Sequence, residues 1–408
     1  MASRSSPTTS QRLSMGTLYF GSVLYQVTQL GIAIVLPQIR TAFHATPAQQ
    51  GLILAGFPLG VGAFALLSGL FVQRWGSTRT VIAGLVVLGV GATVSAFAFS
   101  PASLFGARLI AGAGAGIYFP VTVGLLAANT PEPRRARRVG LLVSLGLAIG
   151  GSVGFLGGAL VGPRFGWQVL LGGLGLVALG GAAVSVIAFR RAPLSLAPLQ
   201  PSRDRALVAP TLRMVSVWAL TLAPLGVLNA GFTAAGFLAA YVTSQHASWG
   251  LVYVGVVGAT ALALTLPGGF LGAWVSERGI DRRIVLAVFA VGSGALFALI
   301  PWADQYAFAA LLATAGLLLG AVLAILFSMP SHIPEMAGPR VPIVVGTIDG
   351  TRILFSAGFA VVFGTVVGLS GYSSAWILTA ILGLGCIPAI ALVPLNRSPA
   401  NPRPTSPR

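Results

Sequence analysis

Long apolar runs alternate with short polar segments along the whole chain. Each run holds about 19–28 residues, which as a helix is enough to cross a hydrocarbon core roughly 30 Å thick. The alternating polar and apolar residues of membrane-barrel strands are absent, so the pattern predicts helical spans. The first run is too long for the core of a signal peptide and is expected to be a retained span. The twelve predicted spans cover residues 14–39, 50–72, 80–98, 103–128, 138–161, 166–189, 214–241, 250–275, 283–302, 305–330, 342–369 and 373–395.

A segment rich in proline and arginine separates the first six apolar runs from the last six. The predicted domains are an N-terminal six-helix bundle at 1–189, a cytoplasmic linker at 190–213, a C-terminal six-helix bundle at 214–395 and a disordered tail at 396–408. The polar turn Gly69–Arg79 follows the second run and is echoed at Gly272–Arg282, 203 residues later. The matching positions are Gly69 with Gly272, Gly76 with Gly279, and Arg79 with Arg282. A repeat at half the length of the chain indicates a duplicated half and is typical of secondary transporters.

The composition places the chain in a membrane. Hydrophobic residues make up 56% of the chain, charged residues 8%, and the mean hydropathy is +0.91. Soluble domains carry about 25% charged residues, so this chain is predicted to be an integral membrane protein. The net charge of +17 would suit nucleic acid on a soluble domain, but the arginines fall in short turns, so we expect no nucleic-acid partner. The single cysteine, Cys386, excludes an intramolecular disulfide.

The arginines also predict the orientation of the chain in the membrane. With the N-terminus inside the cell, 20 of the 24 arginines lie in cytoplasmic segments. Only Arg40 and Arg164 then face outward, while Arg108 and Arg352 lie within spans. We therefore expect a multi-pass protein of the cell membrane (inner or plasma membrane) with both termini in the cytoplasm. The basic run at 134–138 is expected to meet anionic lipid headgroups.

The turn at Gly69–Arg79 resembles the signature loop of the major facilitator superfamily. Gly69, Arg74, Gly76 and Arg79 match that loop, whereas Gln73 stands where the family usually has aspartate. The resemblance extends over nearly the whole chain and implies an all-α integral membrane fold of twelve transmembrane helices in two pseudo-symmetric six-helix bundles. It also implies that these five residues act in gating at the cytoplasmic end. Because Gln73 can hydrogen-bond but carries no charge, this gate is expected to be weaker than in the family.

Two further motifs bear on the resemblance. Arg108–Gly116 in the fourth span is similar to the arginine–glycine motif of the family. The fifth span carries a glycine at every fourth position, which predicts close packing against another helix. These glycines are Gly146, Gly150, Gly154, Gly158 and Gly162. The glycine–proline pair of many drug–proton antiporters is replaced by Val153 and Gly154, which counts against that subfamily.

Three charged residues inside predicted spans are candidates for chemistry. A charge in hydrocarbon costs about 2.5–3.5 kcal/mol on insertion scales, so Arg108, Asp349 and Arg352 each need an explanation. Asp349 and Arg352 lie three positions apart and share a helix face, so they can pair. If the pair faces a central cavity, Arg352 would bind an anionic or polar group and Asp349 would exchange a proton. The alternative is a pair that only neutralises itself.

The remaining candidates are polar side chains near the expected cavity. Arg108 is expected either to contact substrate, as the resemblance implies, or to hydrogen-bond to helix carbonyls. Tyr25, Gln26 and Gln29 form a polar cluster in the first span, and adding 203 to Gln26 gives Asn229 in the seventh span. The resemblance implies that these two spans face each other, so the amides would flank one substrate or else bridge neighbouring helices. Tyr118 and Thr233 are weaker candidates because such residues more often serve packing.

Taken together, these patterns predict a secondary transporter of a small polar or anionic solute. Alternating access would move the solute, coupled to protons through Asp349. The expected partners are this solute, protons and the lipid bilayer, and the protein is expected to act as a monomer. No catalytic, metal-binding or nucleotide-binding motif occurs, so we expect neither an enzyme nor a cofactor. Two alternatives remain open: an exporter of hydrophobic drugs, and a non-transporting receptor or assembly protein, which only Gln73 favours.

Overall fold

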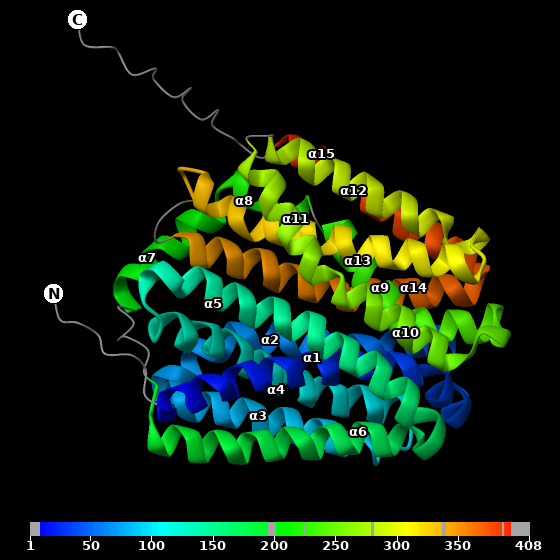
Figure 1. The fold of residues 1–408 in the computed structure, drawn as a ribbon, viewed down its shortest axis with the longest axis horizontal. Helices are drawn as coiled ribbons and strands as arrows, with labels where there is room; N and C mark the ends of the chain where they lie inside the picture. Colours follow the sequence, from blue (N-terminus) through cyan, green and yellow to red (C-terminus); the bar gives the residue numbers. More distant parts are fainter. Residues whose placement is uncertain are drawn as a thin grey trace, which may run out of the picture.

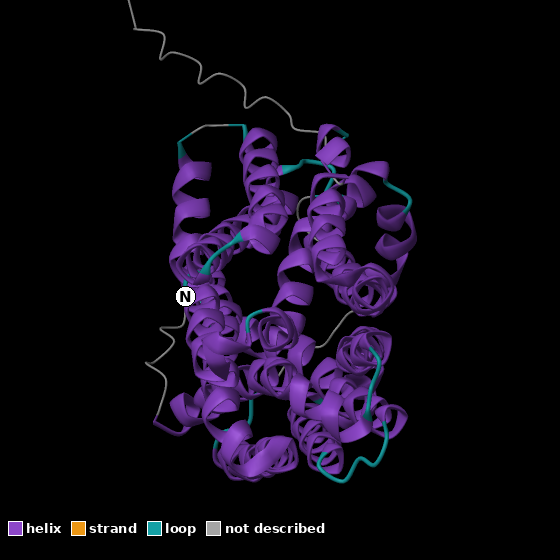
Figure 2. Cartoon of the chain, turned by 90° about the vertical axis from the view of Figure 1, so that its right-hand side faces the viewer, coloured by secondary structure: helices purple, strands orange, loops and turns teal. Residues whose placement is uncertain are grey.

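The computed structural model describes residues 9–194, 201–223, 225–278, 281–336, 340–385 and 387–392, and these residues form helices and short connections without strands (Figures 1 and 2). The first half contains α1 Thr9–Phe43, α2 Pro47–Trp75, α3 Ser77–Ser95, α4 Pro101–Ala128, α5 Glu132–Leu145, a π-helical turn η1 Gly146–Gly150 and α6 Gly151–Arg191. The second half contains α8 Val215–Leu222, α9 Leu225–Gln245, α10 Gly250–Ala263, α11 Thr265–Glu277, α12 Arg282–Leu299, α13 Gln305–Ser328, α14 Val341–Gly385 and α15 Ile387–Ala391. Short 3₁₀ turns η2, η3 and η4 lie at Ala247–Trp249, Ile300–Trp302 and Met329–His332.

These helices form the twelve membrane spans of an all-α membrane fold. Nine helices within the described ranges are long and apolar enough to cross a bilayer. Two of these helices hold two predicted spans each: the stretch from α5 through α6 turns at Gly166 (φ 86°), and α14 turns at Gly371 (φ 82°). Both angles lie in the left-handed region that glycine adopts without strain. The seventh predicted span corresponds to α8 and α9, and the eighth to α10 and α11.

The ends of the chain differ in part from the sequence prediction. The first predicted span begins at residue 14, whereas α1 begins at Thr9, and the hydroxyl of Ser14 donates to the carbonyls of Ala188 and Ala192 and fastens this end of the helix to α6. A further helix, α7 Pro201–Leu212, lies within the predicted linker. Residues 1–8 and the predicted tail at 396–408 lie outside the described residues. The domain boundaries at 189, 213 and 395 stay a prediction.

The two halves repeat the same helix contacts. In the first half Gly112 and Gly116 of α4 pack against the carbonyls of Phe57 and Val61 in α2. In the second half, 204 residues later, Gly316 and Gly320 of α13 pack against the carbonyls of Ala261 and Thr265. The N-caps of α4 and α13 are Ser100 and Asp304, again 204 residues apart. The duplication is therefore visible in the packing itself.

This packing corrects the register of the repeat. The polar turns match at a spacing of 203, which aligns Gly69 with Gly272. Gly272 packs against the backbone of Ala321, whereas no atom would meet a Cβ at Gly69. One residue corresponds to about 100° around a helix, so the two motif glycines point in different directions. The packing repeat of 204 is the structural one, and the two glycines are not equivalent.

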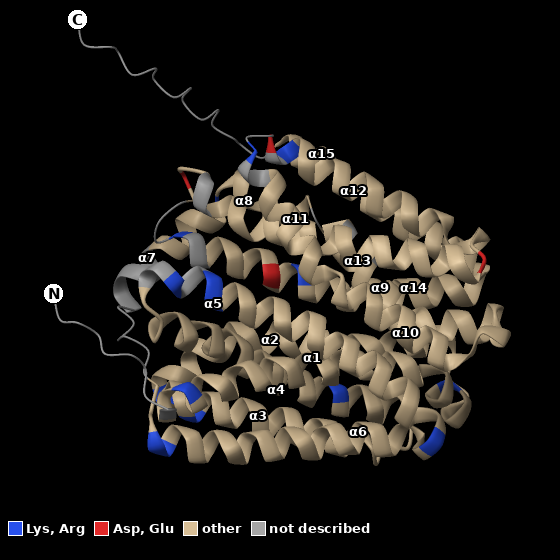
Figure 3. Cartoon of the chain, in the orientation of Figure 1, with Lys and Arg blue, Asp and Glu red and all other residues tan. Residues whose placement is uncertain are grey.

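The two ends of the molecule differ in charge. Most arginines gather where α1 begins and α6 ends, and few lie where α1 ends (Figure 3). We call these the arginine-rich end and the opposite end. Figure 1 shows α1 to α6 on one side of the molecule and α8 to α15 on the other, all running roughly between the two ends.

The halves touch toward the opposite end and separate toward the arginine-rich end. Near the opposite end, Gly51 and Pro47 of α2 contact the α14 backbone at Ala360 and Gly364. Farther along α2, Gly62 meets the side chain of Leu354 of α14. Between residues 63 and 75 of α2 only Ser68 is buried. The predicted gating residues lie in or just after this exposed stretch, and all of them are exposed: Gly69, Gln73, Arg74, Gly76 and Arg79.

Candidate functional site

A cavity of about 430 Å³ lies between the two halves. Its first-half wall comes from α1 and α2, and its second-half wall from α9 and α14. The polar side chains in its lining are Gln29, Thr233 and Ser356, and Phe232 contributes an aromatic face. The lining residues are Gln29, Leu30, Ala33, Leu54, Pro58, Phe232, Thr233, Gly236, Ser356 and Ala360.

An ion pair lies beside this cavity, toward the arginine-rich end. Arg352 donates from Nη2 and Nε to the same oxygen of Asp349, at 2.6 and 3.1 Å. The Arg352 and Asp349 side chains are 14% and 29% exposed. The guanidinium of Arg352 lies 5.0 Å from the ring centroid of Phe232, and Ser356 follows one helical turn later. The pair that the sequence predicted therefore borders the cavity between the halves.

Tyr25 connects the ion pair to the first half. Its side chain is 5% exposed, and its ring stacks on Phe57 with 5.9 Å between centroids. Tyr25 and Phe57 belong to the same cluster of buried residues as Ile353 of α14, which follows Arg352. The segment of α14 that carries the ion pair thus packs against the first half of the protein.

Arg108 bridges α4 to α1 instead of pointing into the cavity. It is 1% exposed, and its Nη1 and Nη2 donate to the carbonyls of Thr28 and Gln29 at 2.7 and 3.1 Å. Its guanidinium lies 4.6 Å from the ring centroid of Phe57. This geometry matches the helix-carbonyl alternative of the sequence analysis. Through the Gln29 backbone, Arg108 positions a residue whose side chain does line the cavity.

The predicted amides divide between the cavity and the helix packing. Of Gln26, Gln29 and Asn229, only Gln29 lines the cavity, while Asn229 donates to the Leu225 carbonyl of its own helix at 2.6 Å. A buried oxygen without a hydrogen-bond partner remains on each of these amides and on Thr233. Buried acceptors normally find a donor, so the unpaired oxygens that line the cavity, on Gln29 and Thr233, can receive hydrogen bonds from a bound solute.

Among the polar and aromatic lining residues, Phe232 and Ser356 were not singled out from the sequence, and Thr233 was only a weaker candidate. Thr233 and Ser356 lie four positions after Asn229 and Arg352, one helical turn along the same face. The i+4 rule applied to the charged and amide candidates would have found both residues.

The contacts of Arg108 give a test of its structural role. Replacing Arg108 with lysine is expected to lower stability more than replacing it with leucine, by about 1–2 kcal/mol. Lysine keeps a buried charge but cannot reach the carbonyls of both Thr28 and Gln29. Leucine carries no charge, and the second half has a leucine, Leu312, at the repeat-related position. Thermal unfolding of the purified variants in detergent measures the difference. A leucine variant no more stable than the lysine variant would contradict this account.

Comparison with known proteins gives matches over most of the chain. The sequence profile described as Major Facilitator Superfamily matches residues 18–348. The putative niacin/nicotinamide transporter NiaP of Bacillus subtilis (strain 168) is 24% identical over 86% of this chain and 92% of its own length. The cephamycin export protein CmcT of Amycolatopsis lactamdurans is 31% identical, but the match spans 31% of this chain and 26% of that protein. The drug efflux pump JefA of Mycobacterium tuberculosis is 30% identical over 39% of this chain and 31% of its own length.

Solved structures show the same fold. A bacterial homolog of the human lysosomal transporter Spinster, in an inward-facing and occupied conformation, superposes with a TM-score of 0.77. The match covers 95% of this chain and 97% of that chain at 15% sequence identity. The inward-facing and unoccupied conformation of a bacterial Spinster homolog gives a TM-score of 0.74.

Proposed function

The chain belongs to the major facilitator superfamily, and on that premise we propose that it is a secondary transporter of a small organic anion. The observation that carries this proposal is the Arg352–Asp349 pair, which borders the cavity between the halves on a segment of α14 that packs against the first half. Arg352 supplies the positive charge for a carboxylate, and Phe232 beside it supplies an aromatic surface. Gln29 and Thr233 add polar contacts from the two halves.

The separation of the halves supports an alternating-access mechanism. We infer that the arginine-rich end lies in the cytoplasm, because positive charge is enriched on that side of membrane proteins. The cell membrane then holds the protein with both termini inside. In this orientation the described conformation opens inward, and rocking of the halves would expose the same cavity to the other side.

Proton coupling follows from the way in which Arg352 is paired. Both of its hydrogen bonds go to one oxygen of Asp349. A proton on Asp349 would weaken this pair and free the guanidinium for a substrate carboxylate. The anion and the proton would therefore enter together, and the site would keep its charge balance in a region where an unpaired charge is costly.

Nicotinate is the first compound to test as substrate. The relative NiaP, which aligns over most of this chain, is named a putative niacin/nicotinamide transporter. Nicotinate carries one carboxylate, one aromatic ring and one ring nitrogen that accepts a hydrogen bond. These groups suit Arg352, Phe232 and the hydroxyl of Thr233.

The test of this function is uptake of radiolabelled nicotinate by proteoliposomes. The wild-type protein is expected to concentrate nicotinate when a pH gradient is imposed. Asp349→Asn is expected to abolish the dependence on the gradient, because the amide cannot exchange a proton, while exchange of labelled for unlabelled nicotinate persists. Asp304→Asn serves as the control, because Asp304 caps α13 away from the ion pair. Gradient-dependent uptake by the Asp349→Asn variant would exclude Asp349 as the coupling residue. The proposal would be overturned if the wild-type protein transported neither nicotinate nor any other organic anion.

Export of hydrophobic drugs is a second candidate function. It is favoured by an apolar cavity in the second half, lined by Leu238, Phe297 and Leu312 among others. The relatives CmcT and JefA, named an export protein and an efflux pump, match parts of the chain. Expression in a host without its own efflux pumps distinguishes the candidates. A drug exporter would raise resistance even with Arg352→Ala, whereas an anion transporter would leave resistance unchanged.

A further inference from the structure

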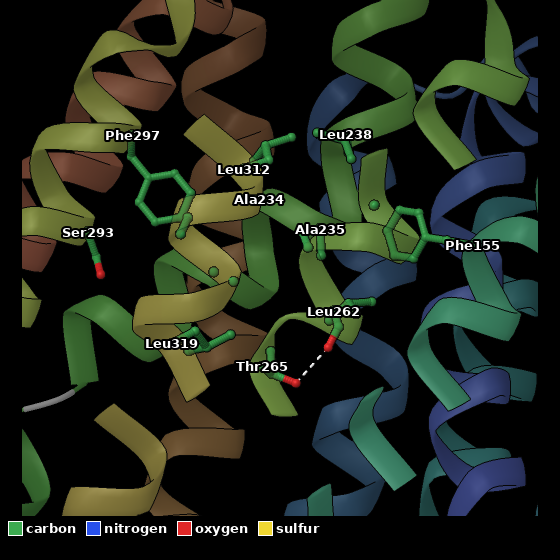
Figure 4. A pocket seen from close by; sticks show the side chains of 15 residues that line it. Phe155, Ala234, Ala235, Leu238, Leu262, Thr265, Ser293, Phe297, Leu312 and Leu319 are labelled. Carbon is green, nitrogen blue, oxygen red and sulfur yellow. Dashed lines mark hydrogen bonds between the residues drawn. The ribbon is translucent and has the colours of Figure 1, made fainter. Parts of the chain in front are cut away.

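A second cavity, of about 540 Å³, lies within the second half, apart from the ion pair (Figure 4). Its walls come from α9, α10, α11, α12 and α13, with one residue, Phe155, from α6 of the first half. None of the lining residues is charged. The hydroxyls of Thr265 and Ser293 already donate to helix carbonyls, those of Leu262 and Phe289, at 2.6 and 2.8 Å. The cavity therefore offers a surface for apolar groups and no free hydroxyl hydrogen for a polar ligand.

The repeat explains why the cavity lies in the second half. At a spacing of 204 residues, Arg108 corresponds to Leu312 and Phe57 corresponds to Ala261. In the first half the guanidinium of Arg108 lies over the Phe57 ring, and both side chains are buried. In the second half, the shorter Leu312 and Ala261 both line the cavity. The exchange of two large side chains for two smaller ones opens space beside helices that otherwise pack in the same way.

Phe155 both lines this cavity and takes part in the contact between the halves. Its side chain points toward the cavity from the side opposite Phe297 (Figure 4). The Phe155 ring packs on Gly258 of α10 so closely that a Cβ at Gly258 would overlap it. Beside it, Ser152 of α6 donates to the carbonyl of Ala259 at 2.8 Å. A relative movement of α6 and α10 would withdraw one wall of the cavity.

We propose that this cavity binds an uncharged apolar group, an aromatic ring or an alkyl chain, and that binding stabilises the conformation in which the halves touch toward the opposite end. A ligand shifts a conformational equilibrium only by its difference in affinity between the two states. Phe155 provides this difference, because it completes the cavity only while α6 lies against α10. For the proposed anion transporter this site is separate from the central cavity that holds the cargo, and an apolar ligand bound there would regulate transport.

The first test locates the ligand by the anomalous X-ray signal of bromine. One set of crystals is soaked with bromobenzene, and another is grown with a phospholipid that carries a brominated acyl chain. Bromine is expected in the cavity of the wild-type protein. A signal from bromobenzene alone identifies a small diffusing ligand, and a signal from the lipid identifies a bilayer acyl chain. No bromine in the cavity from either source would overturn the proposal.

Cavity-filling variants serve as matched controls. Ala261→Phe restores the residue that the first half has at this position, and Ala315→Leu fills the cavity with a smaller change. Both variants are expected to lose the bromine signal, whereas Ala310→Leu, at an exposed alanine of the same helix, keeps it. If Ala261→Phe does not fold, the bromine signal in the Ala315→Leu variant alone tests whether the cavity binds the ligand. Bromine retained at the same position in Ala315→Leu would contradict the proposal.

The second test measures the coupling to conformation. Pro47 and Gly368 lie against each other across the halves, so a cysteine pair at these positions reports contact toward the opposite end. The pair is placed in a Cys386→Ser background, since Cys386 is the single cysteine. In nanodiscs, bromobenzene is expected to raise the cross-linking rate by about threefold or more. The same pair with Ala315→Leu is expected not to respond, which separates the site from effects on the bilayer. The coupling would be refuted if bromobenzene left the cross-linking rate of the cysteine pair without Ala315→Leu unchanged. It would also be refuted if bromobenzene raised the rate equally with and without Ala315→Leu.

Discussion

Replacing Arg352 with alanine is expected to abolish organic-anion flux in proteoliposomes and to lower the stability of the protein. Asp349 would lose the partner that donates two hydrogen bonds to it, at 2.6 and 3.1 Å. Removing one partner of a buried ion pair costs about 3–5 kcal/mol, because the other charge is left unpaired. Both side chains keep some exposure, so we expect a value near the lower end of this range. Flux and the melting temperature in detergent are the two measurements.

A double variant separates the structural from the functional role of Arg352. In Arg352→Ala with Asp349→Ala no charge remains unpaired, so most of the lost stability is expected to return. The flux is expected to stay absent, because the positive charge for the anion is gone. Arg164→Ala is the control, because Arg164 is exposed and follows Gly162, which binds Gln38 near the end of α1 at the opposite end, so neither measurement is expected to change. Wild-type flux in the stable double variant would rule out Arg352 as the anion-binding residue.

Replacing Gly112 with alanine is expected to cause the second large effect, a loss of folded protein. A Cβ at Gly112 would overlap the backbone carbonyl of Phe57 where α4 crosses α2. A backbone atom cannot rotate away as a side chain can, so the two helices must separate. Overpacking of this kind typically costs about 1–3 kcal/mol and occasionally more, and here we expect the upper end. The yield of monodisperse protein in size-exclusion chromatography and the melting temperature measure the effect.

Gly106 of the same helix provides the matched control. No atom lies within 4 Å of a Cβ placed there, and its backbone is helical. Gly106→Ala is expected to leave the yield unchanged or to stabilise the protein by about 0.5–1 kcal/mol, because alanine favours the helix. Equal behaviour of the two variants would show that the tight α2–α4 crossing does not limit stability. The corresponding variant of the second half, Gly316→Ala, is expected to behave like Gly112→Ala, since Gly316 packs on the carbonyl of Ala261.

Properties that depend on a short stretch of chain could be predicted from the sequence. Each apolar run had to be a helix, because hydrocarbon offers no water to satisfy exposed backbone groups. The run of glycines from Gly146 to Gly162 predicted close packing against another helix, and this is confirmed: all five glycines meet α1, as where Gly150 contacts the backbone of Val23 and Gly154 that of Val27. The pairing of Asp349 with Arg352 followed from their three-residue spacing on one helix.

Predictions that linked distant segments were less reliable. Matching two polar turns gave a repeat of 203 residues, whereas the helix contacts repeat at 204, because similar turn residues do not fix which helix face is buried. Gln26 and Asn229 were paired across the halves by that spacing, yet neither lines the central cavity. An error of one residue turns a helix position by about 100°, which is enough to exchange a cavity face for a packing face.

The sequence by itself determined that the chain belongs in a membrane, where its helical spans lie, which family it resembles and which charged residues lie within spans. These follow from hydrophobic length and local spacing, which need no knowledge of other segments. Only the tertiary structure decided that Arg108 binds the carbonyls of Thr28 and Gln29, that Arg352 lies against Phe232 beside the cavity between the halves, and that the second half contains an apolar cavity. Each of these depends on side chains from helices far apart in the sequence, and their meeting is set by helix rotation and packing rather than by any local pattern.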